Sequence, residues 1–253
     1  MKKLIVGMVL GLVISSAHAQ EYKVNKNSGR LEVHLGKARI EGYDGNAIVF
    51  SSTDHRDKTD ERAKGLKAIN GLGLEDNTGL GINVSESGGA VVVQQLKRTD
   101  SPDIRIQVPK GVIVAFQHDS QYGGKVRFEN MENEIEVSAQ YNSVEMRNVT
   151  GPMTVKSIYG HVEADFNSTI KNPISIVSVY GYVDVALPSA TKANLRLDTS
   201  YGEIFVAPEF KIEVTPQGNM IKYSDRVQGK INGGGDLNID LSSNYGKIYL
   251  RKK

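Results

Sequence analysis

The sequence predicts an all-β protein, built as a right-handed β-solenoid or parallel β-helix-like repeat fold with one short helical insertion. A Tyr-Gly pair recurs about every 20 residues in the second half of the chain, and alternating apolar and polar residues follow it. The 253 residues also include 26 glycines but only 7 prolines. This composition is typical of many short strands joined by tight turns. An antiparallel β-sandwich is the alternative fold.

The Tyr-Gly repeat keeps a nearly constant phase along the chain. In SIYGHVEAD (157–165) and SVYGYVDVA (178–186), the pair precedes a run with strand-like alternation. The last interval is about twice as long as the others, and Tyr223 falls midway within it. Six tyrosines share the phase: Tyr122, Tyr141, Tyr159, Tyr180, Tyr201 and Tyr245.

Each repeat has the pattern of a half-buried strand. Val183, Val185 and Leu187 alternate with polar or small residues, which indicates a period of two. A unit of this length cannot bury its apolar face alone, but copies stacked about 4.8 Å apart can do so. A sandwich would instead be built from hairpins, and the fixed phase of the tyrosines favours the solenoid.

The first half of the chain is less regular and contains the predicted helical insertion. Strands are expected within 31–52, and a helix from about Thr59 to Ile69 with Ala63, Leu66 and Ile69 as its apolar stripe. The whole insertion, about 54–72, either covers one end of the core or binds a partner. Because no linker separates it from the strands, residues 20–253 are expected to form a single domain.

The N-terminus reads as a secretory signal peptide. A short basic start precedes an apolar run from Leu4 to Ile14, and Ala17-His18-Ala19 gives an A-x-A cleavage pattern. Removal of residues 1–19 would leave Gln20 first. The protein is therefore expected to be exported, to the periplasm, the outer surface or the medium, and no later segment has the length and apolar character of a membrane span.

Charge and cysteine content restrict the classes of partner. The chain carries 31 basic and 29 acidic residues, and the predicted signal removes Lys2 and Lys3, so the mature chain has 29 − 29 = 0 net charge. Such a chain has no bulk electrostatic attraction to nucleic acid. With no cysteine, no disulfide can support the fold, so it must depend on regular hydrogen bonding and a continuous core.

Several motifs together resemble a known family. They are the signal peptide, the insertion followed by DNTGLGINV (76–84), the repeated Tyr-Gly pairs, and the final INGGGDLNIDLSSNYGKIYL (231–250). Over roughly 25–250 the chain resembles the bacterial family of β-strand-repeat "putative adhesins" of unknown function, found in the cell envelopes of Bacteroidetes and relatives. The resemblance implies a β-solenoid-like fold, an exported location and no catalytic residues. Some relatives are similar to proteins near sigma/anti-sigma regulators, which keeps a regulatory role open.

The residues themselves offer little for catalysis, metal or cofactor binding. The mature chain has four histidines, no cysteine and no G-x-S-x-G elbow, so no nucleophilic triad, cofactor or metal site is predicted. Polysaccharide-active β-helix enzymes need clustered carboxylates, and Glu145, Glu163 and Asp184 share one position of the repeat. We interpret them as the polar positions of alternating strands, with an enzyme as the alternative.

The tyrosines are the best candidate binding residues, together with Tyr182, a second aromatic that no other repeat has. Aromatic rings in a row could bind a glycan or a cell-surface or envelope protein. The interpretation we favour is a structural ladder in which tyrosines pack on one another while glycine makes the turn. Asn142 replaces glycine once, which suggests a turn with positive φ. The predicted function is non-catalytic binding or structure in the cell envelope, with a regulator acting through the insertion as a further alternative.

Overall fold

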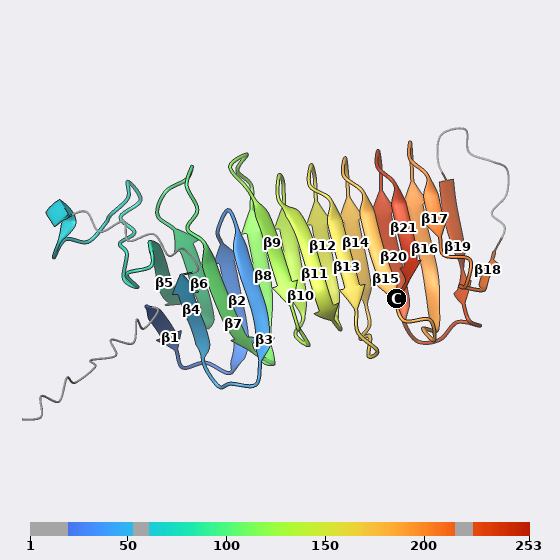
Figure 1. Ribbon diagram of the computed structural model, residues 1–253, viewed down its shortest axis with the longest axis horizontal. Coiled ribbons are helices and arrows are strands. Elements are labelled where there is room, and N and C mark those ends of the chain that lie inside the picture. The colour runs from blue at the N-terminus through green and yellow to red at the C-terminus, as the bar shows by residue number, and fades with distance from the viewer. Residues whose placement is uncertain (1–19, 53–60, 216–224) are drawn as a thin grey trace, which may run out of the picture.

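The computed structural model describes residues 20–52, 61–215 and 225–253 of the chain, so the predicted signal peptide lies outside it. Two sheets of ten and eleven strands lie face to face along an elongated stack (Figure 1). From Ile104 to Val214 the chain passes from one sheet to the other after every strand, so that one strand of each sheet forms a rung. The molecule is therefore all-β and solenoid-like, as predicted.

The first sheet has ten strands, named here in their spatial order. They are β1 (Glu21–Val24), β4 (Ile48–Ser52), β7 (Ile104–Pro109), β3 (Ala38–Tyr43), β9 (Lys125–Glu129), β11 (Ser143–Val149), β13 (Val162–Phe166), β15 (Val183–Leu187), β21 (Ile248–Lys252) and β17 (Ile204–Val206).

The second sheet has eleven strands. In spatial order they are β18 (Ile212–Val214), β19 (Asp225–Ile231), β16 (Ala193–Thr199), β20 (Asn238–Ser243), β14 (Ile174–Ser178), β12 (Met153–Ser157), β10 (Ile135–Ala139), β8 (Gly111–His118), β2 (Ser28–His34), β6 (Ala90–Gln95) and β5 (Ile82–Ser87).

The core lies between the sheets and is built by the alternation seen in the sequence. Val183, Val185 and Leu187 of β15 are fully buried, while Asp184 and Ala186 face outward. Parallel pairing places Val183 beside Val162 on one side and Ile248 on the other, so equivalent residues of successive rungs pack in rows. This parallel register confirms the predicted solenoid-like fold, because an antiparallel β-sandwich would be built from hairpins. Antiparallel pairs occur near the two ends, as between β4 and β7 or between β16 and β19.

The order of the last rungs differs from the order of the sequence. Strands β20 and β21, the last two of the chain, lie between the rung of β14 and β15 and the rung of β16 and β17. Tyr245 is consequently placed between Tyr180 and Tyr201. Tyr223, which lies midway between Tyr201 and Tyr245 in sequence, falls outside the described residues.

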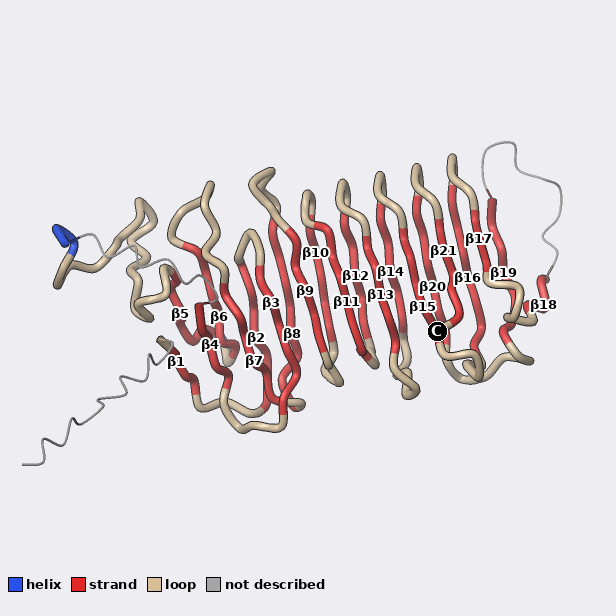
Figure 2. The backbone as a smooth tube through the Cα atoms, in the orientation of Figure 1, coloured by secondary structure: helices blue, strands red, loops and turns tan. Residues whose placement is uncertain are grey.

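The predicted helix of the insertion is wrong where the structure describes it. Only Glu61–Ala63 is helical, as a single 3-10 turn, and Gly65 has a φ of 78°, which ends any helical continuation. Leu66 and Ile69 are 73% and 65% exposed, so the expected apolar stripe does not cover the core. Figure 2 shows the segment as a loop that projects beyond β5. Residues 53–60 lie outside the description.

The projecting loop nevertheless has internal order around Asn70. The Asn70 Oδ1 atom accepts hydrogen bonds from the backbone N–H groups of Leu72 and Leu74, at 2.9 and 3.0 Å. The Asn70 Nδ2 atom donates to the carbonyl of Leu96 at the base. Within 20–52, 61–215 and 225–253, the structure contains no helix with the length and apolar character needed to cross a bilayer.

Candidate binding surface

Five tyrosines form a continuous stack along one rim of the sheets. In spatial order they are Tyr141, Tyr159, Tyr180, Tyr245 and Tyr201, and we call this set the tyrosine ladder. Neighbouring ring centroids are 4.8, 5.1, 4.9 and 5.0 Å apart, with interplanar angles of 5–17°. The predicted packing of tyrosine on tyrosine from rung to rung is therefore confirmed.

The glycine after each ladder tyrosine is required by the closeness of the next turn. A Cβ on Gly181 would lie 2.4 Å from the carbonyl oxygen of Gly160, and one on Gly160 would lie 1.9 Å from the carbonyl oxygen of Asn142. Neither glycine has a positive φ, and neither does Asn142. The expectation that Asn142 replaces glycine because it tolerates positive φ is therefore wrong: steric closeness, and not backbone handedness, selects glycine here.

A buried hydroxyl group supports each of these turns, and the sequence reasoning missed it. The Ser157 Oγ donates to the carbonyl of Asn142 at 2.9 Å and accepts from the N–H of Gly160 at 3.1 Å. Thr199 and Ser243 likewise contact a glycine of their own turn and one of the preceding rung. The signal was present in the sequence as Ser or Thr two residues before each of these tyrosines. The buried hydroxyl groups of these Ser and Thr residues connect successive turns through hydrogen bonds within the core.

Asn142 takes over this role at the first rung of the ladder, where Ala139 replaces the serine. Its side chain is fully buried, and its Nδ2 donates to the carbonyls of Gly36 and Gly124 at 2.7 and 3.0 Å. Its Oδ1 lies 2.9 Å from the Nδ1 of His118. Because Oδ1 can only accept, His118 donates through Nδ1. The side chain of Asn142 thus makes the hydrogen bonds that end the ladder at this rung.

Tyr122 shares the sequence phase but does not join the stack. No ring contact of Tyr122 occurs within the part of the chain that the structure describes, and its side chain is 49% exposed. The turn here contains the additional Gly124, whose N–H donates to the carbonyl of Gly36 at 2.7 Å. The longer turn follows a different path, so the ladder begins at Tyr141.

Tyr182 belongs to a second set of rings on the outer face of the first sheet. We call His161, Tyr182, Tyr249 and Phe205 the outer aromatic row. Tyr182 stacks on His161 at 4.6 Å and meets Tyr249 edge-on at 6.2 Å. Its hydroxyl donates to Glu163, and burial, followed by this hydrogen bond, raises the pKa of Tyr182 to about 12. Tyr182 is therefore occupied by its neighbours and offers no free hydroxyl.

The ladder, in contrast, presents unsatisfied polar groups at the surface. Its rings are 41–65% exposed. Among the described residues, the hydroxyls of Tyr141, Tyr159, Tyr180 and Tyr245 have no hydrogen-bond partner. Since stacking covers the ring faces, what remains accessible is a line of ring edges and hydroxyl groups. Each hydroxyl can both donate and accept a hydrogen bond.

The acidic row predicted from the repeat exists, but each member has its own partner. Glu145, Glu163 and Asp184 lie side by side in register. Burial would raise the pKa of Glu145, yet Lys125, with Arg127 and Arg147, outweighs it and lowers that pKa.

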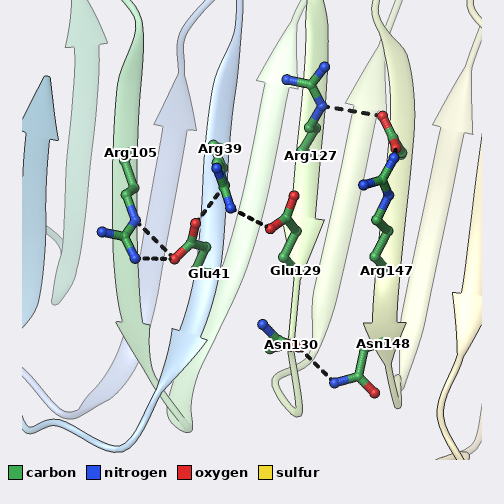
Figure 3. A network of polar contacts seen from close by, with 9 residues as sticks. Arg39, Glu41, Arg105, Arg127, Glu129, Asn130, Arg147 and Asn148 are labelled. Carbon is green, nitrogen blue, oxygen red and sulfur yellow. Dashed lines mark hydrogen bonds and ion pairs between the residues drawn. The ribbon is translucent and has the colours of Figure 1, made fainter. Parts of the chain in front are cut away.

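The other two acids of the row are also paired. Glu163 accepts from Tyr182, and Asp184 from the Nε of Arg251 at 2.8 Å. Figure 3 shows that such charge pairing extends along the same face: Glu41 contacts Arg39 and Arg105. A general acid needs a raised carboxyl pKa, whereas the basic partners of Glu145 lower the pKa of that carboxyl.

Metal coordination receives no support from the described residues. Across 20–52, 61–215 and 225–253, no group of three or more His, Asp or Glu side chains is placed to hold a metal ion. Asp54 and His55, which carry ligand-type side chains in the sequence, lie outside the described residues. In the Gly-rich stretch near the C-terminus, the backbone carbonyl of Asp236 accepts a hydrogen bond from the Nδ2 of Asn172 at 3.1 Å.

The fold and its rim define a class: open, two-sheet stacks of parallel β-strand rungs with a repeated turn. Within that class, the chain belongs to the Toastrack DUF4097 family, whose model matches residues 11–251. This confirms the resemblance drawn from the sequence motifs.

Two solved structures are similar to the chain at low identity. One, a "putative cell adhesion protein" from Clostridium sporogenes, is 12% identical with a TM-score of 0.48, covering 93% of this chain and all of that one. The other, a "putative adhesin" from Bacteroides fragilis, is 11% identical with a TM-score of 0.38, covering 93% and 98%. No curated protein matches the chain in sequence.

Proposed function

We propose that this protein is an exported, non-catalytic binding protein of the cell envelope, with an adhesin-like role, and that the tyrosine ladder binds a carbohydrate polymer. The observation that carries the proposal is the line of four hydroxyls, on Tyr141, Tyr159, Tyr180 and Tyr245, that lack partners among the described residues. Membership of the family supports the fold on which the ladder depends.

The chemistry of the ladder suits a hydroxylated, extended ligand. Ring faces that stack 4.8–5.1 Å apart are not available to an apolar partner, whereas the phenol groups recur at the same interval along a straight line. A polysaccharide offers repeated hydroxyls that can exchange hydrogen bonds with such a line. Stacked tyrosines are also held rigidly, so that little side-chain entropy is lost when a ligand binds.

The framework behind the ladder keeps the hydroxyls in register. The backbone N–H of Tyr159 donates to the carbonyl of Gln140 at 2.7 Å, and that of Tyr180 donates to the carbonyl of Ile158 at 2.9 Å. Together with the buried hydroxyls below the turns, these bonds fix each tyrosine relative to the next. A rigid linear array of weak contacts gains affinity from their number, as in multivalent binding.

The test distinguishes the contribution of the tyrosine hydroxyl groups to binding from that of the aromatic rings. The variant Tyr141→Phe/Tyr159→Phe/Tyr180→Phe/Tyr245→Phe keeps the stack but removes the hydroxyls. Affinity electrophoresis of residues 20–253 against a panel of soluble polysaccharides should show retardation for the wild type and at least tenfold weaker retardation for this variant. Tyr122→Phe, outside the ladder, is the matched control and should bind as the wild type does.

Two outcomes would contradict the proposal. One is the absence of retardation by every polysaccharide of the panel, and the other is retardation that the fourfold variant retains in full. In both cases the ladder would have only its structural role, which the thermal midpoint of Tyr180→Ala would then measure. The exported location is tested separately, by mass spectrometry of the mature N-terminus, for which we expect Gln20.

A further inference from the structure

A shallow cavity lies over the last two strands of the first sheet, apart from the tyrosine ladder. Its volume is about 350 Å³, and it is formed by β17, β21 and the residues that follow them. The residues on which the argument depends are Phe205, Ala207, Glu209, Tyr249, Arg251 and Lys252. The volume is at the lower end of the range for small-molecule sites, about 300–1,000 Å³, and is suited to a single ring.

One wall of the cavity is aromatic. Phe205 stacks on Tyr249 with a centroid distance of 5.4 Å and an interplanar angle of 12°. Its side chain remains 44% exposed because β17 is the edge strand of its sheet among the residues that the structure describes. An exposed phenylalanine at the mouth of a cavity is an apolar surface on which the C–H groups of a ring can pack.

The lining also includes charged side chains, and the guanidinium group of Arg251 is held in position. The Nε of Arg251 donates to both carboxylate oxygens of Asp184, at 2.8 and 2.9 Å, and its guanidinium lies 5.1 Å from the centroid of Tyr249. Among the described residues, the two Nη groups of Arg251 have no hydrogen-bond partner. They therefore provide fixed donors beside the aromatic wall.

The charges around the cavity compensate one another in pairs. Arg251 is paired with Asp184, and the Nζ of Lys252 lies 3.9 Å from a carboxylate oxygen of Glu209. The site thus offers donors and acceptors without a net charge that would select an anion. Ala207, whose N–H donates to the carbonyl of Leu250 at 2.8 Å, contributes only a small side chain to the lining of the cavity.

We propose that this cavity is a binding site for one neutral sugar ring. The C–H face of the sugar packs on Phe205, and its hydroxyls accept from Arg251 and donate to Glu209. The inference builds on the proposed carbohydrate binding of the ladder and adds a second, discrete subsite to it. Because the subsite accommodates a single ring, it can be tested with monosaccharides, which are too short to span the ladder.

The experiment is saturation-transfer NMR of residues 20–253 with the methyl glycosides of glucose, galactose, mannose and N-acetylglucosamine. At least one should show transfer to its C–H protons, with a Kd in the millimolar range. Phe205→Ala and Ala207→Leu, which remove the wall and fill part of the cavity, should each reduce the transfer at least fivefold. Tyr122→Ala, an exposed aromatic residue elsewhere, should leave it unchanged, and all variants should keep the wild-type thermal midpoint.

Three results would overturn the inference: no transfer from any glycoside, full transfer in both cavity variants, or binding of methyl glucuronide more than tenfold tighter than that of methyl glucoside. The last would identify an anion site instead. If the monosaccharides fail while polysaccharides still bind through the ladder, only this inference is wrong. If the monosaccharides bind here while the ladder variant binds polysaccharides normally, only the proposed role of the ladder is wrong.

Discussion

The hydroxyl of Ser243 donates a hydrogen bond of 2.8 Å to the carbonyl oxygen of Gly181, a residue 62 positions earlier in the chain. The same oxygen of Ser243 accepts from the N–H of Gly246 at 3.1 Å. One buried side chain therefore satisfies two backbone groups and ties the last turn of the chain to a turn of the preceding rung.

Replacing this hydroxyl should destabilise the fold. Ser243→Ala leaves a buried carbonyl and a buried N–H without their partner, which costs about 1–3 kcal/mol in the free energy of unfolding. Urea denaturation measures the loss. Ser242→Ala, at an outward-facing position of the same strand, is the control and should change the free energy by less than about 0.5 kcal/mol. Equal effects of both variants would contradict the role given to Ser243.

Adding a methyl group to the turn should have a comparable or larger effect. Gly181→Ala places a Cβ 2.4 Å from the carbonyl oxygen of Gly160, so the stacked turns must separate. We expect a loss of about 1–3 kcal/mol or more in the free energy of unfolding. In Gly71→Ala the new Cβ meets nothing within 4 Å, so this variant should unfold as the wild type does. Thermal denaturation of both variants makes the comparison.

The projecting loop should contribute little to stability. Leu66→Ser/Ile69→Ser/Leu72→Ser replaces three side chains that are 65–84% exposed, so no buried apolar surface is lost. The thermal midpoint should therefore remain that of the wild type. Leu80→Ser, at a buried position just beyond the loop, should lower it clearly. A large drop in the triple variant would show that these side chains do cover part of the core.

Tyr182 should make stability depend on pH in the alkaline range. Burial and the hydrogen bond to Glu163 raise its pKa to about 12, against about 10 in the unfolded chain. A raised pKa means that the native state holds the proton more tightly, so its contribution is complete below pH 10 and is lost as the pH rises through 12. Between pH 9 and pH 12, the free energy of unfolding, measured by urea denaturation, should fall less steeply with pH in Tyr182→Phe than in the wild type. Tyr122→Phe should follow the wild type.

The elements that the sequence predicted best are those with a strict local period. The alternation of Val183, Val185 and Leu187 and the phase of the tyrosines follow directly from strand geometry and from the stacking of like residues. The prediction of a helix in the insertion was wrong because its apolar stripe has only three residues. Such a short stripe does not indicate whether the core has an open surface against which a helix could pack. Gly65, which ends the helical turn, lies within the predicted helix.

Other parts of the candidate surface depend on contacts between distant residues. The pairing of β21 with both β15 and β17 brings Tyr249 beside Phe205, although the two residues are 249 − 205 = 44 positions apart in the sequence. Because strand order is set by the three-dimensional stack and not by proximity in sequence, neither the outer aromatic row nor the cavity beside it could be predicted. The tyrosine ladder, the acidic row and the Ser or Thr before the tyrosines, in contrast, each recur with the repeat in the sequence.

The position of β20 and β21 has a consequence for how the molecule is assembled. Rungs up to β14 and β15 can add to the stack in the order in which they are synthesised. Strands β16 and β17 cannot take their places until the last residues of the chain have arrived, because β20 and β21 lie between them and the earlier rungs. The C-terminal strands therefore complete the structure, and a chain that ends before Asn238 lacks the two strands that join the rung of β16 and β17 to the earlier rungs.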